Sequence, residues 1–274
     1  MSSTEKNNIH ISGPSYLFLS DVHLGAFDDS KNNQLEDDLV QLIDFCEKNH
    51  VRPVVLGDFF DFWMEYKGFR PALGTRILGR FAEFHKKTGN NTLFITGNHD
   101  NWTLNDGVLK QTGFDLEHEY RIMDINNSKV MVFHGDGFKK SEMKYPRPMF
   151  HRILRNPIFT SIYRALLSPT RGLAIMAAFS KHSRKKSNAE DTSNSCLRLN
   201  RWVDEYSKEN STISAYLYGH THHAEIRQNF RAVMVNCGYF GKDRTACLYT
   251  NHRFELVYWN SADCTLTRFQ KPSV

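Results

Sequence analysis

Residues 15–23 read SYLFLSDVH and carry both patterns that decide the fold. The first half is a short apolar run, typical of a buried β-strand, and the run ends at two residues that bind metal ions, Asp21 and His23. Four further apolar runs follow along the chain, at residues 53–56, 92–96, 130–133 and 215–218. Each ends in the same kind of residue, within the sequences GD, GNHD, HGD and GHTHH. Apolar residues at helical spacing, at 35–46 and 77–84, separate the first three runs, so the sequence predicts an α/β fold.

One set of polar side chains follows the ends of these five runs. Its members are Asp21, His23, Asp58, Asn98, His134, His220 and His222. The carboxyl ends of neighbouring strands in an open α/β sheet meet at one crevice, so we expect these side chains to lie together. Aspartate, asparagine and neutral histidine bind manganese, iron, zinc and cobalt, which accept oxygen and imidazole ligands alike. Each motif alone would indicate a turn or a surface histidine, but five in one chain predict a metal site.

Residues 138–186 differ from the rest of the chain in charge. They contain twelve lysines and arginines and one acid, Glu142, whereas the whole chain has a net charge of +5. Their apolar residues fall mostly at helical spacings, interrupted by Pro157 and Pro169. The segment therefore predicts two or three short basic amphipathic helices, with either a solvated basic face or a binding function. The polar residues that follow, 187–195, predict a mobile connection.

The motifs SDVHL, GDFFDFW, GNHD, HGD and GHTHH, in this order and spacing, resemble the calcineurin-like metallophosphoesterase superfamily over about residues 17–259. The resemblance implies a four-layer αββα fold, a β-sandwich flanked by helices, with two metal ions at the strand ends. It assigns Asp21, His23 and His222 to the first ion, Asn98, His134 and His220 to the second, and Asp58 to both. It places His99 beside the ions, over the phosphate of the substrate.

The chemistry of a dimetal site agrees with these roles. Two ions clamp a phosphoryl group and hold a hydroxide formed from water, which attacks phosphorus. Asp58, as the bridging carboxylate, and His99 are the expected catalytic residues, since His99 can donate a proton to the leaving oxygen or stabilise the transition state. Asp100 would orient His99 or a ligand, or cap the loop, and both readings stay open. We expect two divalent ions, manganese first, with iron, zinc or cobalt as alternatives.

Within the superfamily, GDFFDFW at residues 57–63 resembles the UDP-2,3-diacylglucosamine diphosphatases of lipid A synthesis, which also insert a basic, apolar helical lid directly after HGD. The resemblance implies hydrolysis of UDP-2,3-diacylglucosamine to UMP and 2,3-diacylglucosamine 1-phosphate. The residues expected to bind that substrate are Trp63, Asn98, His99, Glu142, Tyr145, Arg155, Arg184 and Ser187. The chain departs from the best-studied branch in having His99 where that branch has arginine, and Lys-Lys-Ser-Glu in place of Thr-Asp-Asp after HGD.

These assignments divide the chain into a dimetal core, residues 1–137 and 201–274, and a helical lid, residues 138–200. Such a lid would bind a lipid-linked sugar nucleotide and lie on an anionic inner-membrane surface, and we expect no nucleic-acid partner. The polar N-terminus lacks a signal-peptide pattern and the five cysteines form no CxxC pair, so we expect a cytoplasmic protein, peripheral to the inner face of that membrane. The alternatives are another phosphoesterase, such as a nucleotide phosphodiesterase or nuclease, and a non-catalytic scaffold.

Overall fold

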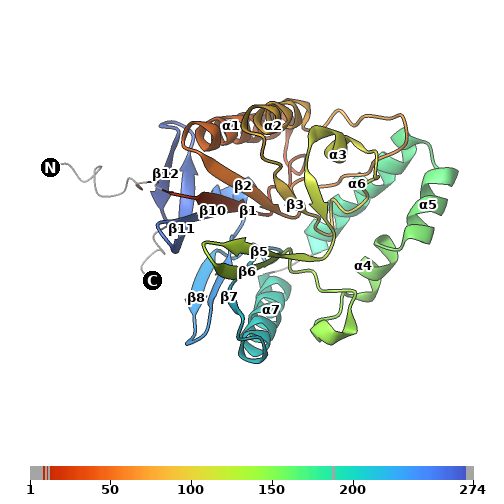
Figure 1. Cartoon of the computed structure of the whole chain (residues 1–274). Coiled ribbons are helices and arrows are strands. Elements are labelled where there is room, and N and C mark those ends of the chain that lie inside the picture. The colour runs from red at the N-terminus through yellow and green to blue at the C-terminus, as the bar shows by residue number, and fades with distance from the viewer. Residues whose placement is uncertain (1–8, 10, 12, 187–188, 270–274) are drawn as a thin grey trace.

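The computed structural model describes residues 9, 11, 13–186 and 189–269, and between residues 181 and 191 it describes the backbone alone. Its strands form two sheets that pack face to face (Figure 1). The seven-stranded sheet has the order β12 (Thr265–Arg268), β11 (Arg253–Asn260), β10 (Thr245–Thr250), β1 (Ser15–Leu19), β2 (Val51–Leu56), β3 (Leu93–Ile95) and β4 (Asp115–Glu117). The five-stranded sheet has the order β5 (Tyr120–Ile125), β6 (Ser128–Phe133), β7 (Ile213–Tyr218), β9 (Val233–Asn236) and β8 (Glu225–Gln228).

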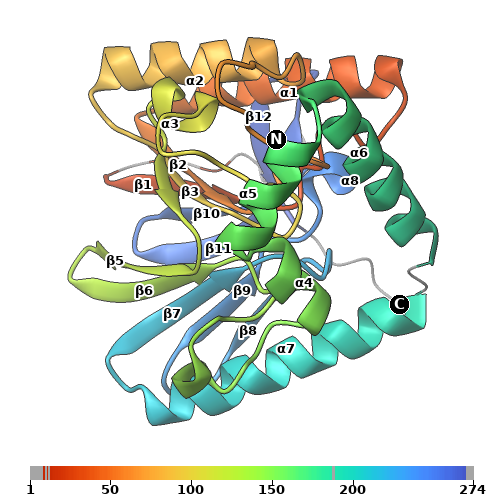
Figure 2. The ribbon, with the colours of Figure 1, turned by 90° about the vertical axis from the view of Figure 1, so that its right-hand side faces the viewer.

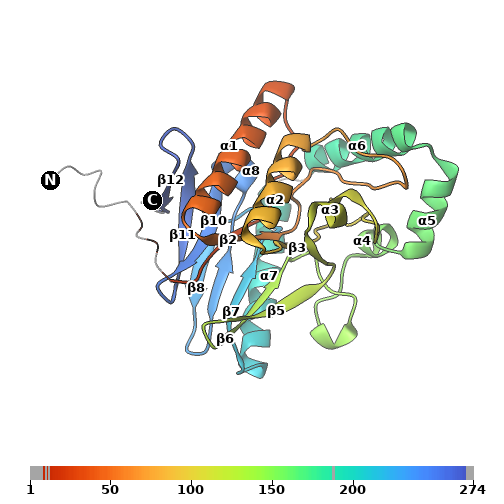
Figure 3. The same ribbon diagram turned by 45° about the horizontal axis from the view of Figure 1, so that its top comes forward.

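Helices cover the outer face of each sheet. The seven-stranded sheet is covered by α1 (Asp29–Lys48), α2 (Thr75–Thr88) and the short α3 (Val108–Thr112), as Figure 3 shows from above. The five-stranded sheet is covered by α7 (Ala189–Glu209), and α8 (Phe240–Asp243) is a single turn between β9 and β10. The expected four-layer αββα fold is thus confirmed.

Alternation of side chains along the central strands explains the layers. On β1, Leu17 and Leu19 pack with residues of α1 and α2, whereas Phe18 points between the sheets. On β7, Leu217 points between the sheets and Tyr216 packs towards α7. Strands that bury apolar side chains on both faces read as continuous apolar runs, which is the pattern that the sequence shows. Because β1, β2, β3 and β4 run parallel, and β6, β7 and β9 likewise, their carboxyl ends lie together at one edge of the sandwich.

An insertion of helices between β6 and β7 stands over this edge (Figure 2). It begins with a short 3₁₀ turn, η2 (Ser141–Met143), and continues with α4 (Met149–Leu154), α5 (Pro157–Leu166) and α6 (Pro169–Lys186). Asn156 caps α5 by accepting hydrogen bonds from two backbone N–H groups, and Pro157 occupies its first turn, where a missing N–H costs nothing. Among the described residues, no helix has both the length and the apolar character needed to cross a bilayer.

The region after α6 differs from the expectation. The polar residues 187–195 were expected to form a mobile connection, but α7 begins at Ala189, so residues 189–195 are helical. The reason is tertiary: the later residues Leu199, Trp202 and Val203 bury one face of α7 against the second sheet, and the polar first turns extend the same helix. Residues 187 and 188 lie outside the described part.

Candidate active site

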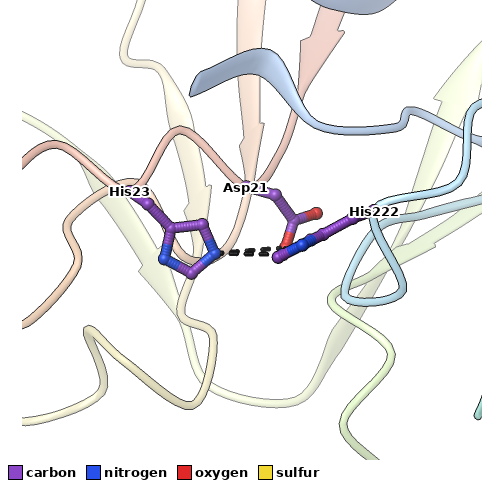
Figure 4. A group of neighbouring side chains, drawn as sticks. All are labelled: Asp21, His23 and His222. Atoms are coloured by element: carbon purple, nitrogen blue, oxygen red, sulfur yellow. Dashed lines mark hydrogen bonds and ion pairs between the residues drawn. The ribbon is translucent and has the colours of Figure 1, made fainter. Parts of the chain in front are cut away.

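The loops at the strand ends bring candidate metal ligands into neighbouring groups. The first group combines Asp21 and His23, which follow β1, with His222, which follows β7 (Figure 4). The Nε2 atoms of the two histidines face each other at 3.1 Å. Asp21 Oδ1 lies 3.2 Å from His222 Nε2 and 3.8 Å from His23 Nε2. Three ligand atoms from distant parts of the sequence therefore converge on one point.

The second group surrounds Asp58, which follows β2. It consists of Asp58, His134 and His220. His134 Nε2 lies 3.2 Å from Asp58 Oδ2 and 3.3 Å from Asn98 Oδ1. His23 Nε2, a member of the first group, is 3.9 Å from the same Asp58 oxygen, so Asp58 lies between the two groups. This is the position that a carboxylate shared by two ions would need.

The backbone turns sharply at five of these positions. Asp21, His23, Asp58, His220 and His222 all have positive φ angles, between 49° and 70°. Such left-handed conformations are uncommon for residues other than glycine, and aspartate, asparagine and histidine tolerate them best. Strained conformations of this kind are retained where the surrounding structure holds them, typically at functional sites. The turns aim successive side chains into one space instead of along the strand.

Two glycines make room for the buried carboxylates. A Cβ atom on Gly97 would collide with the carboxylate of Asp58, and one on Gly219 would collide with that of Asp21. The same carboxylates accept backbone hydrogen bonds, Asp58 from His99 N at 2.9 Å and Asp21 from His220 N at 2.8 Å. The Gly-Asn-His and Gly-His sequences thus pack each ligand loop against the carboxylate of another.

Hydrogen bonds fix the orientation of two histidine rings. His134 Nδ1 donates to the carbonyl oxygen of Leu56 at 2.9 Å, so its Nε2 is the atom that faces Asp58. His99 Nδ1 donates to the carbonyl oxygen of Asp61 at 2.6 Å, which directs its Nε2 to within 4.0 Å of Asp58 Oδ2. The carboxylate of Asp61 lies 3.6 Å from His23 Nδ1. Sequence reasoning missed Asp61, although it stands within the GDFFDFW motif.

Asp100 is a loop cap. Its two carboxylate oxygens accept hydrogen bonds from the backbone N–H groups of Phe59 and Gly97, each at 2.7 Å. Asp100 thereby ties the loop after β2 to the loop after β3, and of the two readings that the sequence left open, this geometry is the capping one. Burial, with the neighbouring charge of Asp58, raises the pKa of Asp100 to about 6.

Neighbouring charges and burial shift the pKa values of two buried histidines in opposite directions. Burial alone would lower the pKa of His134, but the carboxylate of Asp58 outweighs it and raises that pKa to about 10. Burial and the neighbouring His134 lower the pKa of His220 to about 3. One positive charge is thus favoured beside Asp58, on a ring that could otherwise bind a metal. A cation entering the group would displace that proton, since a histidine ligand must be neutral.

The residues present suit divalent metal ions. Asp21 Oδ1 is buried, and its polar neighbours among the described residues are the imidazole nitrogens of His222 and His23, at 3.2 and 3.8 Å. A buried carboxylate oxygen that faces imidazole nitrogens is costly unless a cation satisfies it. The mixture of carboxylate, amide and imidazole donors suits manganese, iron, zinc or cobalt. Asp21, His23 and His222 could hold one ion, Asn98, His134 and His220 another, with Asp58 reaching both.

Comparison with known proteins agrees with this geometry. A sequence profile described as calcineurin-like phosphoesterase matches residues 14–224. The chain belongs to this family. It is therefore a metal-dependent phosphoester hydrolase.

Several relatives of this phosphoesterase share one name. A UDP-2,3-diacylglucosamine hydrolase of Porphyromonas gingivalis is 28% identical over 218 residues, which is 75% of this chain and 82% of the relative. Proteins of that name from Aliivibrio fischeri and Haemophilus ducreyi are 26% and 23% identical, over 75% and 88% of this chain and 80% and 99% of theirs. Among solved structures, an archaeal phosphodiesterase is 12% identical with a TM-score of 0.45, over 88% of this chain and 98% of its own.

The inserted helices of the phosphoesterase meet the strand-end loops at a cavity of about 80 Å³. Its lining comprises Phe62, Asn98, His99 and Trp102 from the core, and Phe150, His151, Leu154, Met176, Phe179 and Ser180 from α4 and α6. The ring of His151 lies 6.4 Å from that of His220, and Ser180 Oγ lies 3.3 Å from His99 Nδ1. Neither contact could be predicted from the sequence, because both depend on how the helices fold back over the core.

Three of the expected substrate contacts lie away from this cavity. Trp63 is only 1% exposed and stacks on Phe60 with ring centroids 4.3 Å apart, so it belongs to the core and does not line the mouth of the site. Tyr145 is buried against Trp202 of α7, with ring centroids 5.3 Å apart. Glu142, on η2, is exposed. None of the three lines the cavity that holds Asn98 and His99.

Arg155 forms hydrogen bonds and an ion pair within the protein. Its Nη2 atom donates to the carbonyl oxygens of Thr96 and Gly97, at 3.1 and 2.7 Å, and lies 3.0 Å from Asp136 Oδ2. It therefore joins the end of α4 to the two loops that carry Asn98 and His134. The side chain of Arg184 and the whole of Ser187 lie outside the described part of the chain.

Proposed function

We propose that this phosphoesterase hydrolyses the diphosphate of UDP-2,3-diacylglucosamine, releasing UMP and 2,3-diacylglucosamine 1-phosphate. One observation carries the proposal: a cavity lined by apolar side chains of an inserted helical segment opens directly beside His99 and Asn98. A substrate that carries a diphosphate next to a diacylated sugar requires this combination. The names of the relatives support the same substrate.

The proposed metal centre uses all seven strand-end residues. Asp21, His23 and His222 would bind one divalent ion, Asn98, His134 and His220 the other, and Asp58 both. Bound there, two such ions, for which we propose manganese, would supply a water nucleophile at neutral pH and offset charge on the phosphoryl oxygens. Asp58 acts by fixing both sets of ligands around a single carboxylate.

Three polar groups are proposed to contact the phosphate. His99 presents Nε2 to the site, because its Nδ1 proton is held by the Asp61 carbonyl. It can hydrogen-bond a phosphoryl oxygen or pass a proton to the leaving oxygen. Asn98 lines the same cavity, and His151 reaches it from α4. The inserted segment would therefore supply a polar group as well as apolar ones.

Residues 138–200 are proposed to act as a substrate lid on a core formed by residues 1–137 and 201–274. Leu154, Met176 and Phe179 line the cavity from the lid, and Phe62 and Trp102 face them from the core. Each methylene buried among them contributes about 0.8 kcal/mol, so a short apolar groove is enough to hold an acyl chain.

The outer face of the lid is proposed to rest on the anionic surface of the inner membrane, on its cytoplasmic side. Ile158, Ile162 and Leu166 lie one helical turn apart on α5 and are 70%, 54% and 78% exposed. They form a continuous apolar stripe on a segment with twelve basic residues and one acid. Apolar side chains with surrounding cations are the pattern of helices that lie at a membrane surface.

The test is a comparison of substrates with manganese at fixed salt. UDP-2,3-diacylglucosamine should be cleaved much faster than UDP-N-acetylglucosamine or single-stranded DNA. The variant Phe179→Asp, which places a charge in the cavity lining, should lower kcat/KM for the acylated substrate by about 100-fold, the scale of placing an unpaired charge against an acyl chain. Phe230→Asp alters an 81% exposed phenylalanine outside the cavity and is the matched control. Faster cleavage of DNA would favour a nuclease instead.

A further inference from the structure

A second, larger cavity of about 440 Å³ lies on the other side of α4. Residues that line it include Lys139, Arg147, Arg152 and Arg155, together with Glu119 and His118. It shares no lining residue with the cavity beside Asn98 and His99. Nothing in the proposed reaction makes use of this basic cavity.

The faces of α4 separate the two cavities. Phe150, His151 and Leu154 line the cavity at the metal centre. Arg152 and Arg155 point to the basic cavity, on the adjacent face of the helix. Figure 2 shows α4 and α5 crossing in front of the strand ends. The basic cavity is therefore a separate compartment at the junction of the inserted helices with the core.

The two buried arginines of this cavity are held by carboxylates. Arg147 Nη1 lies 2.7 Å from Glu119 Oε1, and its Nε lies 3.2 Å from Asp136 Oδ2. Arg155 shares that same Asp136 oxygen at 3.0 Å. These pairs keep both guanidinium groups rigid at the cavity wall. Two carboxylates thus oppose two arginines, so they leave the other cations of the cavity uncompensated.

Lys139 and Arg152 are those other cations. Both are exposed, and within the described part of the chain neither side chain forms an ion pair or hydrogen bond. Arg155 also lines the cavity, and its buried Nε lacks a hydrogen-bond acceptor among the described residues. Two exposed cations without a partner in the described part of the protein, beside two guanidinium groups held at the wall, make the cavity electrostatically complementary to an anion.

We propose that this cavity binds a phosphate group, carried by a small phosphomonoester or by a lipid, at a site distinct from the metal centre. Its volume lies within the range of small-molecule sites, and arginine donors match the geometry of phosphate oxygens. Ile153 and Ile158, which neighbour lining residues in the sequence, are 45% and 70% exposed, so a lipid tail could leave the cavity along them. The proposal is independent of which phosphoester the metal centre cleaves.

Binding is tested on the full-length, metal-loaded protein with two kinds of probe. Inorganic phosphate and UMP are titrated by calorimetry, and vesicles of phosphatidylcholine with or without phosphatidate are used in flotation. The variants Lys139→Glu and Arg152→Glu change exposed residues, and thermal melting confirms that they fold. Each should weaken binding about tenfold, the scale of one charge-assisted hydrogen bond. Lys140→Glu makes the same charge change at the next residue, which does not line the cavity, and should bind within twofold of the unaltered chain.

The arms distinguish the two sources of phosphate. A loss confined to phosphate or UMP binding identifies a soluble ligand, and a loss confined to phosphatidate vesicles identifies a lipid headgroup. Neither Lys139 nor Arg152 lines the cavity beside Asn98 and His99, so we expect any anion binding there to remain in every variant, and only the difference between variants counts. If Lys139→Glu and Arg152→Glu bind every probe as tightly as the unaltered chain, or if Lys140→Glu weakens binding equally, the cavity is not a phosphate site.

Discussion

The strand-end loops bury polar side chains, whereas the inserted helices leave large apolar side chains exposed. In the loops, Asp21, Asp58 and His134 are at most 2% exposed, and each is held by hydrogen bonds or ion pairs to the others or to the backbone. In the helices, large apolar residues such as Ile158 and Leu166 are left 70% and 78% exposed. The loops therefore hold charged side chains in a buried, hydrogen-bonded arrangement. The helices expose an apolar surface that suits an apolar partner. Damage to one should therefore leave the function of the other measurable.

The largest effect is expected at Asp58. Because this carboxylate lies between both groups of ligands, Asp58→Ala should abolish turnover of every phosphoester, whether or not it carries acyl chains, and reduce bound metal. Steady-state rates and elemental analysis check this, with circular dichroism to confirm folding. Rates near those of the unaltered enzyme on a small soluble phosphodiester would show that the strand-end loops are not the reaction centre.

Replacement of His99 should lower the catalytic rate without changing the metal content. Loss of a positioned acid or charge stabiliser lowers rates by about 10²–10⁴-fold, so His99→Ala should fall in that range for acylated and small substrates alike. Its metal content should stay unchanged. A variant that has lost one equivalent of metal would instead make His99 a ligand.

A variant of Asp61 tests whether a residue that orients a metal ligand affects metal binding. Its carboxylate lies 3.6 Å from His23 Nδ1, and loss of such an orienting partner typically weakens metal binding by about 10–100-fold. Asp61→Asn should show that loss in a chelator competition assay. Asp106→Asn, on an exposed loop, is the matched control. Equal metal affinity in both variants would mean that Asp61 has no role at the metal centre.

The smallest effect is expected on the outer face of α5. Ile162→Glu should reduce flotation with anionic vesicles by about fivefold, since it interrupts an exposed apolar stripe and adds a negative charge. Cleavage of a small soluble phosphodiester should not change. Ile226→Glu, on the exposed face of β8, makes the same exchange away from the inserted helices. If the two variants float equally well, the stripe does not contact the membrane.

The sequence predicted the fold, and named side chains that the structure brings together as candidate ligands, for one reason. In each case an apolar run and the ligands that follow it are contiguous, so the pattern for the strand and the pattern for the site are read together, as at residues 15–23. The contacts that were missed join distant segments. Asp61 meets His23 across two loops, Tyr239 stacks on His222 with ring centroids 4.2 Å apart, and His151 reaches the site from an inserted helix.

Composition also does not show whether a side chain is buried or exposed. Trp63 is an aromatic residue in a motif beside Asp58 and was expected to bind the substrate, but the chain turns it inwards onto Phe60. Arg155 was expected to contact substrate because it is basic and lies in the inserted segment. In the structure its Nη2 atom donates to backbone carbonyl oxygens and to Asp136. Whether a polar side chain faces a ligand or its own backbone depends on tertiary packing that spacing along the chain does not encode.

The left-handed backbone at Asp21, His23, Asp58, His220 and His222 restricts which residues can replace them. A substitute must donate to a cation and also adopt positive φ, and the residues that do both easily are aspartate, asparagine and histidine. Glutamate at position 58 would keep the charge yet lose the conformational preference, and threonine would clash through its branched Cβ. About three residue types, aspartate, asparagine and histidine, are therefore suited to these positions. Ligand chemistry and chain geometry select the same few residues, which is why short motifs in this chain carry so much information.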